Sequence, residues 1–180
     1  GHTLETEWNP LINAIRDSKK IIIAAINGVC AGAGVSIALA CDLTITHKDT
    51  KFMGAFSKLG LAPDAGATYI FTRALGYHKT MEFFLLGEPL LGLELFNNGL
   101  INKLSEKIMD DAKTIAHNLN SLAPLSMELI KKNIKASFDM SFSKSMEMEK
   151  CSQRFLGNSS DYKEGLSAFL EKRKPNFKGH

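Results

Sequence analysis

Short apolar runs alternate with small-residue segments in the first half of the chain, a pattern typical of an α/β protein. Apolar residues recur at helical spacing over residues 4–15, and Ile21–Ile26 is a continuous apolar run of strand length. Because such runs occur in strands covered on both faces, we expect a strand there that is buried on both faces. An Asn-Gly turn, a helix over 32–40 and a strand over 42–46 follow. This order predicts a βαβ unit with parallel strands.

A second, more irregular unit follows, and the last third of the chain changes character. Residues 51–56 are predicted to form a strand, which a glycine-bearing loop joins to a helix over about 67–75. From Ile108 onward, apolar positions recur only at helical spacing. They predict helices over 108–122, 127–138, 142–156 and 161–172.

Composition and charge exclude several classes of function. Hydrophobic residues make up 44% of the 180 residues and charged residues 23%, as in an ordinary globular protein. The net charge of +3 is too small to indicate a nucleic-acid surface. The longest apolar stretches are interrupted by polar residues, so no membrane span is expected. Three cysteines at unpatterned spacings indicate neither a disulfide framework nor a zinc site, and the histidines do not occur at ligand spacing. Because no disulfide framework is indicated, a reducing, cytoplasmic location is expected.

The segment around Gly32 and Gly34 admits four interpretations. A dinucleotide-binding turn needs a small residue where Ile37 stands, and a phosphate P-loop needs a Gly-Lys-Ser/Thr sequence that does not follow. The glycines could instead only let a strand turn tightly into a packed helix. Alternatively, the first backbone N–H groups of this helix, which lack intrahelical partners and bulky cover, could donate to a ligand oxygen that becomes negative.

Four groups of residues occur in the order and spacing of one known family. They are Ile21–Gly34 with Ala38–Asp42, Lys51–Phe52 with Ala55–Thr68, Gly87–Pro89 with Asn98–Lys103, and Phe169–Phe177. Together they resemble the crotonase (enoyl-CoA hydratase/isomerase) superfamily over essentially the whole chain. The resemblance implies an α/β, ClpP-like β/β/α spiral core over residues 1–107 and a C-terminal helical oligomerisation region over residues 108–180. Family members have a further segment before the position of residue 1, so the core is expected to be N-terminally incomplete.

The resemblance also implies roles for individual residues. The backbone N–H of Ala33 falls on the second oxyanion donor, and Asp64 on the single acid/base of isomerase members. Ser36 and Phe56 stand where hydratases carry two glutamates. The stretch 55–64 is especially similar to the 1,2-epoxyphenylacetyl-CoA isomerases of phenylacetate breakdown, and next to enoyl-CoA isomerases. Contacts to the acyl-CoA substrate are expected from Gly32, Gly34, Ser36, Phe56, Phe169 and Lys172.

The expected function is therefore the isomerisation of an acyl-CoA thioester, either a 3-enoyl-CoA or a ring epoxide. Coenzyme A is part of the substrate, and no metal or other cofactor is expected. The resemblance implies a homotrimer or a dimer of trimers. Two alternatives stay open: an enoyl-CoA hydratase, and an inactive acyl-CoA-binding or assembly subunit. At single residues, Asp64 could be only a helix N-cap, and Lys172 only a cation at a helix C-terminus.

Overall fold

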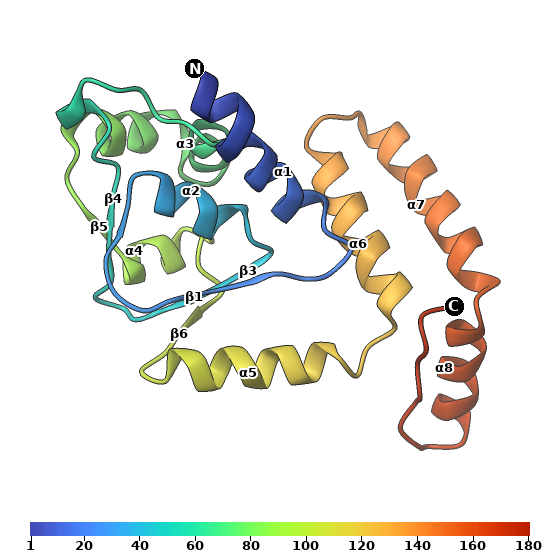
Figure 1. The fold of residues 1–180 in the computed structure, drawn as a ribbon. Coiled ribbons are helices and arrows are strands. Elements are labelled where there is room, and N and C mark those ends of the chain that lie inside the picture. Colours follow the sequence, from blue (N-terminus) through green and yellow to red (C-terminus); the bar gives the residue numbers. More distant parts are fainter. The chain divides into compact units, whose positions relative to one another are not determined.

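The structure is a computed structural model that describes residues 1–180, and its chain forms two compact units (Figure 1). The first unit contains Gly1–Ser18 and Ile22–Lys113, and the second contains Lys19–Ile21 and Thr114–His180. The predicted division into a spiral core over residues 1–107 and an oligomerisation region over residues 108–180 stays a prediction.

The first unit holds all the strands and most of the short helices. It begins with a π-helical turn (η1), and a 3₁₀ turn (η2) precedes its longest helix. Its elements are η1 Leu4–Trp8, α1 Asn9–Asp17, β1 Ile23–Ile26, β2 Cys30–Ala31, α2 Ala33–Ala40, β3 Leu43–Thr46, β4 Lys51–Met53, η2 Ser57–Leu59, α3 Ala67–Leu86, β5 Leu90–Leu91, α4 Gly92–Asn97, β6 Lys103–Leu104 and the start of α5 Ile108–Leu119.

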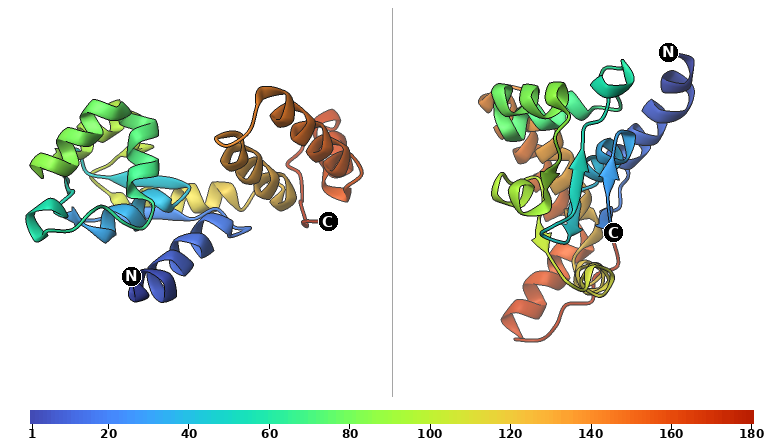
Figure 2. Two further views of the ribbon diagram at one scale, coloured as in Figure 1. Left: turned by 90° about the horizontal axis from the view of Figure 1, so that it is seen from above. Right: turned by 90° about the vertical axis from the view of Figure 1, so that its left-hand side faces the viewer.

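The strands form two three-stranded sheets, in the orders β1-β3-β6 and β2-β4-β5. Strands β1 and β3 are parallel, with Ile23 opposite Leu43 and Ile26 opposite Thr46, which confirms the predicted parallel βαβ unit. Strand β4 pairs in parallel with β2 but antiparallel with β5. The segment from residue 51 onward, predicted as a second, more irregular βαβ-like repeat, is therefore not a parallel repeat of the segment over residues 21–46. In the right-hand view of Figure 2, α3 and α4 lie to one side of the strands and α1 and α2 to the other.

Strand β1 differs from the prediction in its burial. All four of its residues, Ile23–Ile26, are only half-buried, although the apolar run predicted a strand covered on both faces. The reason is its place in the sheet, because β1 is an edge strand that pairs with β3 alone. The fully buried strand positions are instead Ile45 on β3 and Phe52 on β4.

Aromatic packing dominates the core of the first unit. The Phe71 and Phe83 rings stack with centroids 4.8 Å apart, and Phe84 meets Phe71 edge-on at 5.2 Å. A Cβ on Gly54 would lie 3.1 Å from both the Phe83 and the Phe84 rings, so glycine lets this strand end approach the cluster without displacing the rings. Helix α3 carries all three rings and extends beyond the predicted end at residue 75, so Phe83 and Phe84 lie in its unpredicted part. It kinks at Gly76, which has φ 74°, and continues to Leu86.

The second unit is all-helical, as predicted. Helices α6 Pro124–Ser137, α7 Phe142–Gly157 and α8 Ser160–Leu170 follow the end of α5. The chain after α8 returns along that helix and is fixed to it. The buried Asp161 carboxylate accepts hydrogen bonds from the backbone N–H groups of Lys178 and Gly179, at 2.7 and 2.9 Å. The Arg173 guanidinium binds both carboxylate oxygens of Glu164, at 2.6 and 2.9 Å.

Candidate active site

The N-terminus of α2 is open in the way that the glycine segment predicts. Gly32 precedes the helix with φ 54° and ψ −129°, a conformation that L side chains rarely adopt, and its N–H donates to the Met53 carbonyl at 3.0 Å. The next two N–H groups, of Ala33 and Gly34, lie in the first turn, where no preceding helical carbonyl exists to accept them. A Cβ on Gly34 would meet nothing within 4 Å, so side chains leave the approach to this turn clear.

Asp64 lies beside α2, in the loop before α3. Ser36 follows Ala33 by one helical turn, and its hydroxyl donates to the backbone carbonyl of Asp64 at 3.1 Å. The Oδ1 atom of Asp64 is buried and has no hydrogen-bond partner. Buried polar atoms are nearly always paired, so an unpaired carboxylate oxygen calls for an explanation. The structure thus brings Ser36 and Asp64 together, within one turn of the predicted oxyanion donor.

The capping alternative for Asp64 has no hydrogen bond to support it. Helix α3 begins at Ala67, its N-cap residue is Gly66, and no side chain caps the helix. The Asp64 backbone carbonyl accepts from the Ala67 N–H at 3.0 Å, but this is a main-chain bond that any residue could make.

Neither residue at the hydratase glutamate positions can exchange protons with a substrate. Phe56 has no ionisable group; it is 6% exposed and packs against Phe84, with ring centroids 6.1 Å apart. Ser36 is fully buried, and its hydroxyl is engaged by Asp64. That bond favours an indirect role for Ser36 over the predicted direct contact with substrate.

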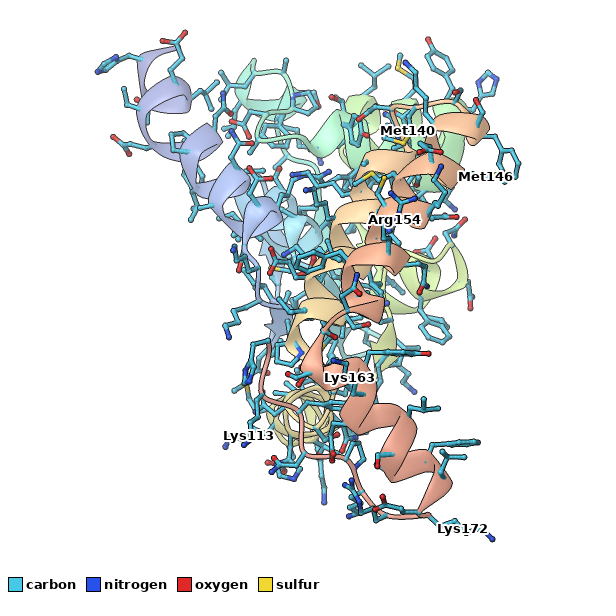
Figure 3. The ribbon with its side chains drawn as sticks, turned by 90° about the vertical axis from the view of Figure 1, so that its right-hand side faces the viewer. Lys113, Met140, Met146, Arg154, Lys163 and Lys172 are labelled. Carbon is cyan, nitrogen blue, oxygen red and sulfur yellow. The ribbon has the colours of Figure 1, made fainter.

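Phe169 and Lys172, the predicted coenzyme A contacts, belong to the second unit. The Phe169 side chain is 80% exposed at the end of α8. Lys172 has φ 53°, and it closes the helix in a Schellman motif: its N–H donates to the Phe169 carbonyl, and the Arg173 N–H donates to the Ala168 carbonyl. Figure 3 shows the Lys172 side chain directed away from α8, which suits a contact with an external anion as well as a helix-capping role.

Other reactive groups do not assemble a second centre. His47 contacts Glu106 at 3.0 Å and Asp49 at 3.6 Å, and a hollow of about 460 Å³ adjoins it, lined by none of the predicted site residues. Burial raises the pKa of the Cys30 thiol to about 11, so this cysteine is not a thiolate at neutral pH. No cluster of three or more histidine, cysteine or acidic residues could hold a metal ion. None of the helices is both long and apolar enough to cross a bilayer.

Sequence reasoning missed one residue of this site, Ala65. It has φ 50°, in the left-handed region that non-glycine residues seldom occupy, and it is only 5% exposed. The Pro-Asp-Ala-Gly turn signal was visible, but nothing in the sequence indicates that an alanine adopts this conformation.

The first unit thus combines two small sheets with helices on either side, a helix whose first N–H groups are open, and beside that helix a half-buried aspartate with one buried, unpartnered oxygen. The chain belongs to the enoyl-CoA hydratase/isomerase family, in the crotonase superfamily, because the profile of that family matches residues 2–180. The family binds acyl-CoA thioesters, and its α/β crotonase fold with a helical C-terminal part is the predicted fold.

Some of the similar proteins are named as isomerases and others as hydratases. The chain is 38% identical to the 1,2-epoxyphenylacetyl-CoA isomerase of Escherichia coli K12, over 99% of this chain and 69% of the relative. It is 35% identical to a probable enoyl-CoA hydratase of Rhodobacter capsulatus, over 99% of this chain and 72% of that one. The crystal structure of an enoyl-CoA hydratase from Polaromonas superposes with a TM-score of 0.92 at 32% identity, over 95% of this chain and 67% of that one. The chain therefore spans about two thirds of the length of these relatives.

Proposed function

We propose that this chain is, or is part of, an acyl-CoA isomerase that uses one carboxylate as its acid/base. The observation that carries the proposal is the buried, unpartnered Oδ1 of Asp64 beside the first turn of α2. An unpaired carboxylate oxygen costs stability, whereas a group that accepts a substrate proton needs a free lone pair. The same atom is therefore unfavourable for folding and suited to catalysis.

The proposed reaction moves a double bond by one carbon. Asp64 removes a proton from C2 of a 3-enoyl-CoA, and the electron pair of that C–H bond moves onto the thioester oxygen as an enolate. The backbone N–H of Ala33 donates to this oxygen, with Gly32 and Gly34 leaving room around it. Asp64 returns the proton at C4 while the double bond forms between C2 and C3. For a ring-epoxide thioester, the same acid/base would assist the opening to an oxepin.

Isomerisation is favoured over hydration because hydration needs a group that activates water. Ser36 and Phe56 stand where the family's hydratases have glutamates, and neither can act as a general base. Only Asp64 remains, and a single carboxylate is enough to move a proton between two carbons of one substrate. The likeness to the E. coli isomerase agrees with this reading, although a relative named as a hydratase is almost as similar.

Residues of the second unit are proposed to contact substrate and to take part in the assembly. The exposed Phe169 ring and the Lys172 ammonium would contact the nucleotide part of coenzyme A, where a cation complements phosphate. Exposed apolar side chains on α6 and at its C-cap, among them Ile130, Ile134 and Phe138, would be covered in a homotrimer or a dimer of trimers.

The decisive assay compares two substrates on one preparation. A 3-enoyl-CoA should be isomerised far faster than crotonyl-CoA is hydrated, with both followed by the absorbance of the conjugated thioester. Asp64→Asn keeps the shape of the side chain but cannot take a proton, so turnover should fall by about 100-fold or more. The matched control is Asp49→Asn, which alters an exposed aspartate beside His47 and should leave turnover unchanged.

The alternatives predict other results. Rapid hydration of crotonyl-CoA would replace the isomerase assignment with a hydratase of unusual chemistry. Binding of an acyl-CoA without turnover of either substrate would indicate an inactive binding or assembly subunit instead.

A further inference from the structure

The backbone carbonyl of Asp64 is held from two sides. The Ala67 N–H donates to it at 3.0 Å, which closes a turn over residues 64–67, and the Ser36 hydroxyl donates to it from α2 at 3.1 Å. Ser36 is fully buried, so this hydroxyl has no access to solvent water as an alternative partner. The bond therefore ties the turn that carries Asp64 to the helix that carries the predicted oxyanion donor.

The turn itself has an uncommon backbone. Both of its central residues have positive φ, 50° at Ala65 and 83° at Gly66, as in a type I′ turn. Glycine adopts such angles freely, but an alanine does so only when its surroundings hold it there. The Ala65 methyl packs with Ile12 of α1 and Ala40 of α2, and Ile15 and Ile37 contact the same small cluster.

We propose that Ser36 and Ala65 are positioning residues that together fix the Asp64 carboxylate beside the first turn of α2. The inference rests on the proposed function, because it concerns the same carboxylate. An unpartnered carboxylate oxygen would gain hydrogen bonds by turning toward water. The two anchors restrain the backbone from which the side chain projects: Ser36 holds the carbonyl of Asp64, and the packed Ala65 methyl fixes the next residue, so the loop cannot shift to carry the carboxylate into water.

A purely structural role for Ser36 would be shared by any buried hydroxyl that binds a backbone carbonyl. Thr46 offers that comparison, since it is fully buried and its hydroxyl donates to the Ile26 carbonyl at 3.1 Å. Thr46→Val therefore removes the same kind of bond from a place that has no contact with Asp64. A difference between the two variants isolates the positioning of Asp64 from general stability.

The first experiment measures kcat and KM on a 3-enoyl-CoA. Ser36→Ala should lower kcat by about tenfold, because small displacements of a catalytic group cost much of its effect, while KM stays within about twofold. Ser36→Cys keeps the shape and a weak donor, so it should recover part of the loss. Ala65→Gly frees the turn and should lower kcat in the same way, even if Ser36→Ala does not fold. Thr46→Val should leave both constants unchanged.

A second readout does not depend on activity. The ¹³C resonance of the Asp64 carboxyl group, assigned by its loss in Asp64→Asn, should shift or broaden in Ser36→Ala and stay in place in Thr46→Val. An unchanged resonance together with an unchanged kcat in Ser36→Ala would overturn the inference. If Asp64→Asn retains full turnover, the proposed function is wrong, and the carboxyl resonance alone then decides whether Ser36 and Ala65 position Asp64.

Discussion

Replacing Asp64 by alanine should make the protein more stable while abolishing its activity. Truncation removes the buried Oδ1, which has no hydrogen-bond partner, and leaves the backbone bonds to Ser36 and Ala67 in place. A buried polar atom without a partner costs about 1–3 kcal/mol, and more when it is charged. Part of this gain is offset by the small space that the side chain leaves. We therefore expect a net gain of about 1–2 kcal/mol in the free energy of unfolding.

The capping interpretation predicts the opposite sign. Loss of an N-cap aspartate costs about 0.5–2 kcal/mol, so an Asp64 that capped α3 would make the alanine variant less stable. Since 1 kcal/mol shifts the melting temperature of a protein of this size by roughly 2–4 °C, the two interpretations differ by several degrees.

Thermal and urea unfolding of wild type and variant measure this difference, and Asp161→Ala provides the matched control. Asp161 is a fully buried aspartate whose carboxylate, unlike Oδ1 of the half-buried Asp64, is paired: it accepts hydrogen bonds from two backbone N–H groups. Its loss leaves those donors unpaired and should destabilise the protein by about 2 kcal/mol or more. If Asp64→Ala melts earlier than wild type and retains turnover, Asp64 is a structural residue and the proposed site is wrong.

Two further predictions concern packing and pH. A Cβ on Gly92 would lie 2.3 Å from the backbone carbonyl of His47, so Gly92→Ala should lower the free energy of unfolding by about 2 kcal/mol or more. The control is Gly157→Ala, whose added methyl group meets nothing within 4 Å and should change the free energy of unfolding by less than about 1 kcal/mol. Hydrogen bonds from Arg173 lower the pKa of Glu164 to about 2. Because this pKa is lower than in the unfolded chain, the ionised carboxylate stabilises the fold at pH values above the pKa of the unfolded carboxyl, and the effect is lost as pH falls toward 2. The ¹³C carboxyl resonance of Glu164 should therefore titrate near pH 2. In Arg173→Gln, the pKa that this resonance reports should move toward the ordinary value of about 4.5.

Helices α1, α2 and α5 to α8 and strands β1 and β3 were predictable because their patterns are long enough to read, whereas α4 and the second half of α3 were not predicted. The four C-terminal helices carry two or more turns of apolar spacing each, and the structure places α5, α6, α7 and α8 where the pattern indicates. Strands β2, β5 and β6 contain two residues each, too few for any periodicity, and the sequence did not predict them. The predicted burial of β1 was wrong for another reason: an apolar run does not reveal whether its strand has one neighbouring strand or two.

Some features of the candidate site could likewise be predicted from the sequence, and others could not. Its N–H donors could be predicted, because glycines at a helix start have a direct physical meaning. The importance of Asp64 came from the family resemblance, since a Pro-Asp-Ala-Gly sequence by itself indicates only a turn. The bond from Ser36 to Asp64 joins residues far apart in the chain, and no local signal marks it. The left-handed Ala65 was unpredictable because alanine is rarely found with that φ.

The bond between Ser36 and Asp64 also restricts how this scaffold can evolve. Position 36 has no exposed surface, and its side chain already touches the loop that carries Asp64. A glutamate introduced there, as in the family's hydratases, would need the volume that this loop occupies and would displace Asp64 from its support. One substitution would thus remove the proposed acid/base before the new one had a partner at position 56. Conversion between the two chemistries would therefore require coupled changes, with an intermediate that is poor at both.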